Sequence, residues 1–111
     1  MKKDIREIMR QQELRHGLPV ERGYTARTAK TYFIQGKITR LIKIGLTIGT
    51  VAERLKVLQS TSPDELIVLA SIQGDLERAI HHQFREHRAH GEWFKPAPEL
   101  LKFISLLNTA V

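Results

Sequence analysis

The sequence predicts an α+β fold in which helices flank a small, mostly antiparallel sheet of three strands. Two short runs rich in aromatic and β-branched residues, Tyr32 to Ile34 and Leu41 to Thr47, lie on either side of a polar connection and predict a hairpin. A continuous apolar run from Leu66 to Ala70 predicts the third strand, which we expect to be central and buried. Helical spacing follows the second and third strands and returns at the end of the chain, an order that is typical of a small α+β domain.

Three helices are predicted after the hairpin. The first covers about residues 51–59, because Thr50 and Glu53 have the spacing of a capping box. The second is expected over residues 74 to about 88, where apolar residues recur every three or four positions. The last begins near Pro98, a residue that suits the first turn of a helix.

The chain of 111 residues is predicted to hold one domain, residues 31–111, preceded by a basic arm and linker, residues 1–30. Its net charge is +6, and residues 1–30 contribute most of it, with eight Lys/Arg against four Asp/Glu. Asp4 to Arg15 has helical spacing, so we expect a helix or an arm there. A basic arm suits a polyanionic partner, while a solvated tail is the alternative.

The composition excludes several kinds of site and location. The chain has no cysteine, which rules out disulfides and thiolate zinc sites. No apolar run reaches membrane-spanning length, and the first residues lack the apolar core of a signal peptide. We therefore predict a cytoplasmic protein that makes no use of a membrane.

Two residues do not suit a plain hairpin. Lys43 interrupts an otherwise apolar strand, and Gly45 weakens that strand unless backbone or ligand must come close. Tyr32 lies in the neighbouring strand, so a tyrosine, a lysine and a glycine are expected to meet on one small sheet. Taken singly, each has an ordinary alternative: the tyrosine packs in the core, and the lysine protects a sheet edge.

The hairpin resembles that of the GIY-YIG nuclease family, in which two tripeptides lie on neighbouring strands. Tyr32 matches the tyrosine of the first tripeptide, eleven positions before Lys43. Lys43-Ile44-Gly45 matches the second, in a Lys-Ile-Gly form typical of a phage-related branch. Arg54 follows Gly45 by nine positions, at the spacing of the family's arginine.

The resemblance continues to about residue 104. Glu77 falls on the helix after the third strand, where the family places its metal-binding glutamate. His81 follows it by four positions. Together with Gly91-Glu92-Trp93-Phe94, this pair resembles the signature of the Lys-Ile-Gly branch.

The resemblance implies a metal-dependent endonuclease that hydrolyses phosphodiester bonds of DNA with one metal ion. Glu77 would bind Mg²⁺ or Mn²⁺, both of which prefer oxygen ligands. Arg54 would clamp the scissile phosphate, and Tyr32 would orient or deprotonate the attacking water. Lys43 would supply the positive charge that a tyrosine needs to act as a base, and His81 would transfer protons.

DNA is therefore the expected partner. The candidate nucleic-acid contacts are Lys30, Lys37, Arg40, Gly45 and Lys56. Since the domain is close to a minimal catalytic module, a separate protein partner for targeting also fits the resemblance.

Two departures from the family pattern keep a second function open. Leu58 stands one helical turn after Arg54, where relatives often carry His, Tyr or Lys. Ala89 stands where many have asparagine. A non-catalytic module that binds nucleic acid through a degenerate nuclease fold is the alternative, and in that case Arg54 and Glu77 could form a structural ion pair.

Overall fold

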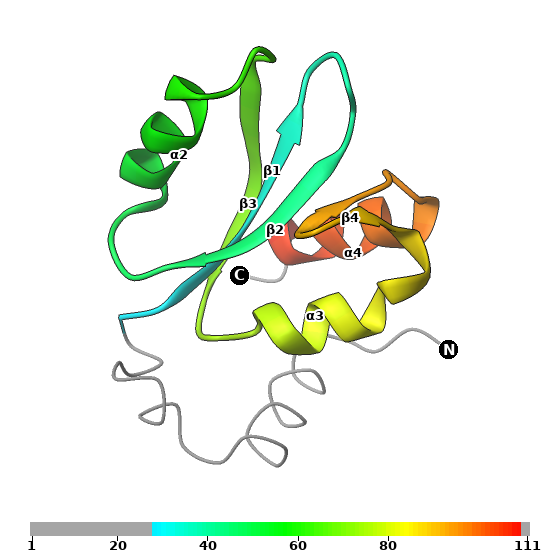
Figure 1. Cartoon of the computed structure of the whole chain (residues 1–111). Coiled ribbons are helices and arrows are strands. Elements are labelled where there is room, and N and C mark those ends of the chain that lie inside the picture. The colour runs from blue at the N-terminus through cyan, green and yellow to red at the C-terminus, as the bar shows by residue number, and fades with distance from the viewer. Residues whose placement is uncertain (1–27, 110–111) are drawn as a thin grey trace.

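The computed structural model describes residues 28–109 and confirms the α+β class. Its elements are β1 (Lys30–Gly36), β2 (Ile42–Thr47), α2 (Val51–Ser60), β3 (Leu66–Gln73), α3 (Glu77–Gln83), the 3-10 helix η2 (Arg85–His87), β4 (Arg88–His90), β5 (Trp93–Phe94) and α4 (Pro98–Thr109). The strands form one antiparallel sheet in the order β3-β1-β2-β5-β4 (Figure 1). The prediction of three strands was therefore wrong, since the described part of the chain has five.

The two additional strands are too short for their sequence pattern to reveal them. β4 has three residues and β5 has two, whereas an alternating pattern needs at least four residues to be recognised. Phe94 of β5 is completely buried, and the neighbouring Trp93 packs on the opposite face of the sheet. The segment extends the sheet beyond β2 and fills the core on both faces.

The predicted hairpin is confirmed, and its register runs from Lys30 opposite Thr47 to Gln35 opposite Ile42. A carboxylate from a distant part of the chain fixes its loop. The side chain of Asp64 accepts hydrogen bonds from the backbone N–H groups of Ile38 and Thr39, both at 3.0 Å. The hairpin loop is thus held against the chain that leads into β3.

The sheet has a hydrophobic core on each face. On one face α2 packs against Tyr32, Ile34 and Leu66 through Val51, Leu55 and Leu58. On the other face α3 and α4 cover a larger core that includes Phe33, Ile42, Ile44, Ile80, Phe84, Phe94, Leu100 and Phe103. Because successive residues of a strand point to opposite faces, β1 supplies both cores, with Phe33 in one and Tyr32 and Ile34 in the other.

The helices agree with the sequence in type but not always in extent. The capping box of Thr50 and Glu53 is confirmed at the start of α2, and α4 begins at the predicted Pro98. The prediction of a helix over residues 74–88 was too long. Gly74 has a φ of 122°, which no α-helix contains, and after Gln83 the chain tightens into η2 before entering β4.

β3 is an edge strand, so its predicted central position was wrong. Among the described strands it pairs only with β1, whereas β1 pairs with both β2 and β3. The outward side chains of Ile67 and Val68 remain 42% and 36% exposed. A continuous apolar run predicts burial on both faces, and here α2 and α4 cover only parts of the strand.

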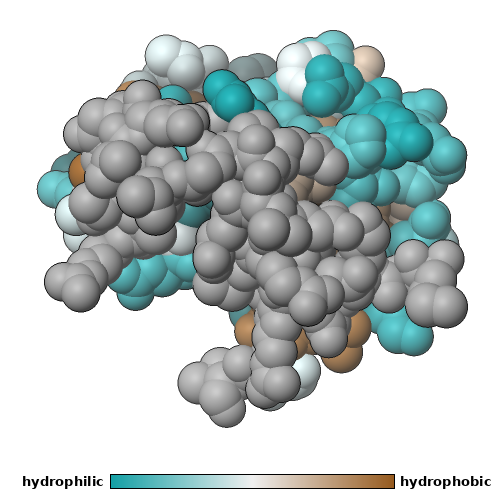
Figure 2. All heavy atoms as spheres, turned by 90° about the horizontal axis from the view of Figure 1, so that it is seen from below, coloured by the Kyte–Doolittle hydropathy of each residue, from teal (hydrophilic) through white to brown (hydrophobic). Residues whose placement is uncertain are grey.

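The predicted basic helix or arm falls almost entirely outside the described residues, and the predicted boundary after residue 30 stays a prediction. Within residues 28–109, every helix is too short or too polar to cross a membrane. Figure 2 shows that the described surface visible from below is mainly hydrophilic, with small hydrophobic areas.

Candidate active site

Tyr32 and Gly45 lie directly opposite each other at the centre of the hairpin. A Cβ atom on Gly45 would collide with Cζ and the hydroxyl oxygen of Tyr32 and would lie 2.9 Å from its Cε1. The ring of Tyr32 therefore lies against the Gly45 backbone, and only 1% of Tyr32 is exposed. The glycine that looked anomalous in the strand is required because the tyrosine ring occupies the space of its side chain.

Arg54 brings a positive charge to the hydroxyl group of Tyr32. It lies in the first turns of α2, and its Nε donates a hydrogen bond to the Tyr32 hydroxyl at 3.5 Å. An open depression of about 520 Å³ is lined by Leu46, Thr47, Ile48, Gly49 and Arg54. A guanidinium group at the wall of an open depression is well suited to bind a phosphate in fork geometry.

Lys43 forms a salt bridge with Glu92. The positively charged group that contacts the Tyr32 hydroxyl is Arg54, and not Lys43 as the sequence suggested. The Nζ atom of Lys43 lies 2.7 Å from Oε1 of Glu92, and 5.8 Å from the centre of the Trp93 ring. Its side chain is only 13% exposed. Lys43 therefore neutralises Glu92 and holds the loop before β5 against β2.

Glu77 and Glu92 form a pair of carboxyl groups beside Lys43. Burial favours the neutral form of Glu92, but its pKa is held below 4.5. The main cause is Lys43, through a hydrogen bond and its charge, and smaller contributions come from His81 and from a hydrogen bond with Glu77. Two carboxyl groups this close repel each other when both are ionised, unless a proton or a cation lies between them. The start of α3 therefore brings carboxyl oxygens from two parts of the chain together.

His81 fastens α3 to the edge of β2. Its Nε2 lies 2.8 Å from the carbonyl oxygen of Ile44. Since a carbonyl only accepts, Nε2 must carry the proton, which leaves Nδ1 as the acceptor of the neutral ring. Burial lowers the pKa of His81 below 6.5, opposed by the Ile44 carbonyl and by Glu92, so the ring is neutral at pH 7.

The start of α3 is anchored to the sheet through Thr31. The buried hydroxyl of Thr31 donates to the carbonyl of Gly74 at 2.8 Å and accepts from the N–H of Leu76 at 2.9 Å. Leu76 immediately precedes Glu77, and Thr31 immediately precedes Tyr32. Thr31 therefore positions the start of α3, where Glu77 lies, and the next residue, Tyr32, contacts Arg54 of α2.

The residues present fit a single hard cation with few protein ligands. The carboxyl groups of Glu77 and Glu92 supply oxygen ligands of the kind that Mg²⁺ and Mn²⁺ prefer. Within residues 28–109, no group of three or more Cys, His, Asp or Glu side chains could enclose a metal ion. An ion at Glu77 would therefore complete its coordination with water and substrate oxygens, as Mg²⁺ usually does.

We expect the lowered pKa of His81 to make folding sensitive to acid. Between pH 6.5 and the lower pKa of the folded protein, the unfolded chain binds more protons at this position, so the free energy of unfolding falls as the pH falls. His81→Gln should remove the part of this pH dependence that comes from His81, because glutamine does not titrate. Its amide N–H can still donate to the Ile44 carbonyl, so the fold is kept. Urea unfolding of both proteins between pH 7 and pH 5 would measure the pH dependence, and equal losses would contradict the assignment.

The other predicted nucleic-acid contacts lie around the periphery. Lys37 and Arg40 are exposed in the hairpin loop. This loop joins the ends of β1 and β2 that lie farthest from the Arg54 depression. Lys56 is exposed on α2, and Lys30 pairs with Thr47 at the end of β2 that leads to the Arg54 depression. Of Lys30, Lys37, Arg40 and Lys56, only Lys30 therefore pairs with a residue that lines the depression.

Glu92 is the residue that sequence reasoning did not assign. It lies within the Gly91-Glu92-Trp93-Phe94 segment, but its partner Lys43 is 49 positions away. No local spacing reveals such a pair, and only the pairing of β5 with β2 brings it together.

The comparisons with known proteins agree with a nuclease-like role. No curated protein and no solved structure significantly matches the chain. Residues 23–107 match the model of the T5orf172 domain, which covers most of the chain. The protein therefore belongs to the T5orf172 domain family, a phage-associated family of nuclease-like domains.

Proposed function

We propose that the protein is a metal-dependent endonuclease of the GIY-YIG type that hydrolyses phosphodiester bonds of DNA. The observation that supports this best is the contact of Arg54 with the Tyr32 hydroxyl at an open depression. The depression includes the end of β2, and α3 is attached to the same strand through His81. A nucleophile-orienting hydroxyl, a phosphate-binding guanidinium and a carboxylate are the groups that this reaction needs.

In the proposed mechanism, Arg54 binds the non-bridging oxygens of the scissile phosphate through its remaining N–H groups. Its bond occupies one lone pair of the Tyr32 hydroxyl, and the remaining lone pair or the proton of that group would orient the incoming water for in-line attack. His81 presents Nδ1 as a proton acceptor because Nε2 is engaged by Ile44. Lys43 keeps Glu92 ionised next to Glu77.

Glu77 would hold the Mg²⁺ or Mn²⁺ ion, with Glu92 beside it. When bound, such an ion supplies positive charge to the phosphate oxygens and to the leaving oxygen.

One observation favours the alternative, a module that binds nucleic acid without cleaving it. Leu58, at the position where related nucleases often carry a proton-transfer group, packs against the Tyr32 core. Ala89 is exposed in β4 and brings no functional group. In this case the protein would bind nucleic acid in a salt-dependent manner and leave it intact with any divalent metal.

A plasmid-nicking assay with Mg²⁺, with Mn²⁺ and with EDTA decides between the two functions, and Arg54→Lys tests the site. Lysine keeps the charge but loses the planar fork, so we expect a rate loss of about 100-fold. The melting temperature should change little, because Arg54 makes one long bond at a half-exposed position.

The control is Lys102→Arg, an exchange between the same two residue types at an exposed position of α4, which should cleave at close to the wild-type rate. Normal cleavage by folded Arg54→Lys protein would remove Arg54 from the site. A purified wild-type protein that binds DNA but never nicks it would favour the alternative.

A further inference from the structure

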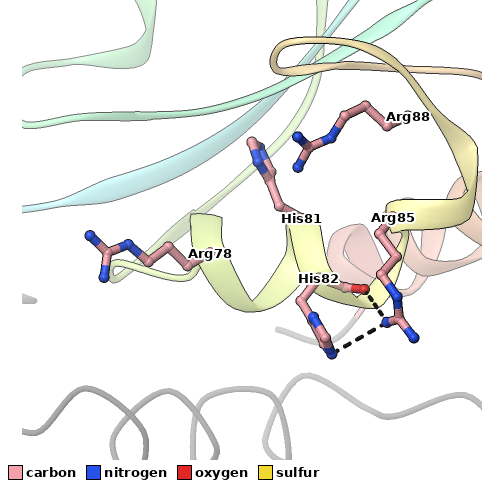
Figure 3. A pocket seen from close by; sticks show the side chains of 5 residues that line it. All are labelled: Arg78, His81, His82, Arg85 and Arg88. Atoms are coloured by element: carbon pink, nitrogen blue, oxygen red, sulfur yellow. Dashed lines mark hydrogen bonds between the residues drawn. The ribbon is translucent and has the colours of Figure 1, made fainter.

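A basic hollow lies along α3, on the side where His81 reaches the sheet edge. It has a volume of about 550 Å³ and is lined by Arg78, His81, His82, Arg85 and Arg88. Figure 3 shows Arg78 on α3 and Arg85 beyond the end of α3, with Arg88 reaching from β4 toward His81. Among residues 28–109 the lining consists of arginines and histidines, and the three arginines give the hollow its positive charge.

Arg78 and His82 lie one turn apart on α3, and Arg85 opens η2, which follows α3 after Phe84. An advance of seven residues covers about 10 Å in an α-helix, and the 3-10 turn lengthens it slightly. One strand of duplex DNA places a phosphate about every 3.4 Å along the axis, so the two arginines can reach phosphates that are about three steps apart.

Within residues 28–109, no acidic side chain forms a salt bridge with the arginines of the hollow. The salt bridges of this part of the chain join Lys37 to Glu65, Lys43 to Glu92 and His87 to Glu99. Arg85 is held against the end of α3, since its Nη1 donates to the carbonyl oxygen of His82 at 2.8 Å. A guanidinium has five N–H donors, and this bond orients the group while using one of its nitrogens.

The hollow borders the candidate active site at His81. His81 lines the hollow and also bonds the carbonyl of Ile44, the residue before Gly45. A DNA strand that lies with one phosphate at Arg54 could therefore continue past the edge of β2 and along α3.

We infer that the hollow binds the backbone phosphates of a DNA strand next to the bond that is cleaved, with Arg78 and Arg85 as its two main contacts. This inference rests on the proposed DNA endonuclease function and extends it, because neither arginine belongs to the hydrolytic groups. The contacts are made to phosphates and carry no sequence preference.

The test compares two double variants of the full chain, each of which loses two positive charges. Arg78→Gln/Arg85→Gln removes the proposed contacts, and Lys95→Gln/Lys102→Gln removes two exposed lysines near and on α4. Fluorescence anisotropy with a labelled DNA duplex in EDTA would measure Kd at several KCl concentrations, and thermal melting would check that each variant is folded.

We expect the arginine variant to reduce the slope of log K against log[KCl] by about 0.9 for each lost phosphate contact, and to bind at least about tenfold more weakly near 0.1 M KCl. The lysine variant should keep both the slope and the affinity. Equal slopes in the two variants, or a wild-type protein that does not bind the duplex, would overturn the inference. Tighter binding to an RNA duplex of the same sequence would overturn its assignment to DNA.

Because binding is measured without metal, the result does not depend on cleavage. A protein that binds with the expected slopes but never nicks plasmid would retain this inference and lose the proposed endonuclease function. A protein that nicks plasmid while both variants have equal slopes would do the reverse.

Discussion

Glu77→Gln is expected to abolish DNA cleavage while the protein stays folded. The replacement keeps the size of the side chain and its ability to hydrogen bond to Glu92, but removes the charge that would hold Mg²⁺ or Mn²⁺. Loss of one group that stabilises transition-state charge typically costs about 100-fold or more in rate, and a metal ligand belongs to this class. The measurement is the nicking rate of supercoiled plasmid over a range of Mg²⁺ concentrations.

Glu86→Gln provides the matched control, since Glu86 is an exposed glutamate of η2, outside the carboxyl pair. It should nick plasmid at the wild-type rate and with the wild-type dependence on Mg²⁺. If Glu77→Gln behaves in the same way as this control, Glu77 does not hold the metal and the proposed mechanism fails.

Gly45→Ala is expected to reduce both stability and activity. The new methyl group would collide with the ring of Tyr32, which cannot move away freely because it is buried beneath α2. Overpacking a well-packed core costs about 1–3 kcal/mol. In a domain of this size, each kcal/mol lowers the melting temperature by about 4–8 °C.

The same displacement moves the Tyr32 hydroxyl away from Arg54, and a shift of about 1 Å in a catalytic group can cost about 100-fold in rate. Gly49→Ala is the comparison for stability, because its methyl group would meet only the end of the exposed Glu53 side chain, at 3.2 Å. Gly45→Ala protein that melts as the Gly49→Ala protein does and cleaves as the wild type does would mean that the contact between Tyr32 and Gly45 is not important.

The parts of the fold that the sequence predicted correctly depend on neighbours along the chain. The hairpin follows from two runs of strand-forming residues on either side of a polar loop, and the start of α2 follows from Thr50 and Glu53, three positions apart. The contact of Tyr32 with Arg54 spans 22 positions, but both residues lie on these local elements. The resemblance assigned both residues to one site, and the direct contact between them comes from the structure.

The parts that it did not predict depend on distant pairings. β5 consists of two residues and exists because it pairs with Ile42 and Lys43, and Glu92 reaches Lys43 only through that pairing. The edge position of β3 depends on β1 pairing on both sides, which the apolar run from Leu66 to Ala70 cannot reveal. The basic hollow was likewise missed, because Arg88 joins the residues of α3 only after β4 folds back.

The buried hydroxyl of Thr31 has a consequence for the order in which the site is assembled during folding. The hairpin and α2 can bring Tyr32 and Arg54 together through short-range contacts, which form early. Glu77 joins them only after β3 has paired along β1, because Thr31 fixes the turn at Gly74 beyond the end of that pairing. On the proposed mechanism, a nascent or partly folded chain can hold a phosphate but cannot hydrolyse it, so DNA in the cell would meet a competent nuclease only when the sheet is complete.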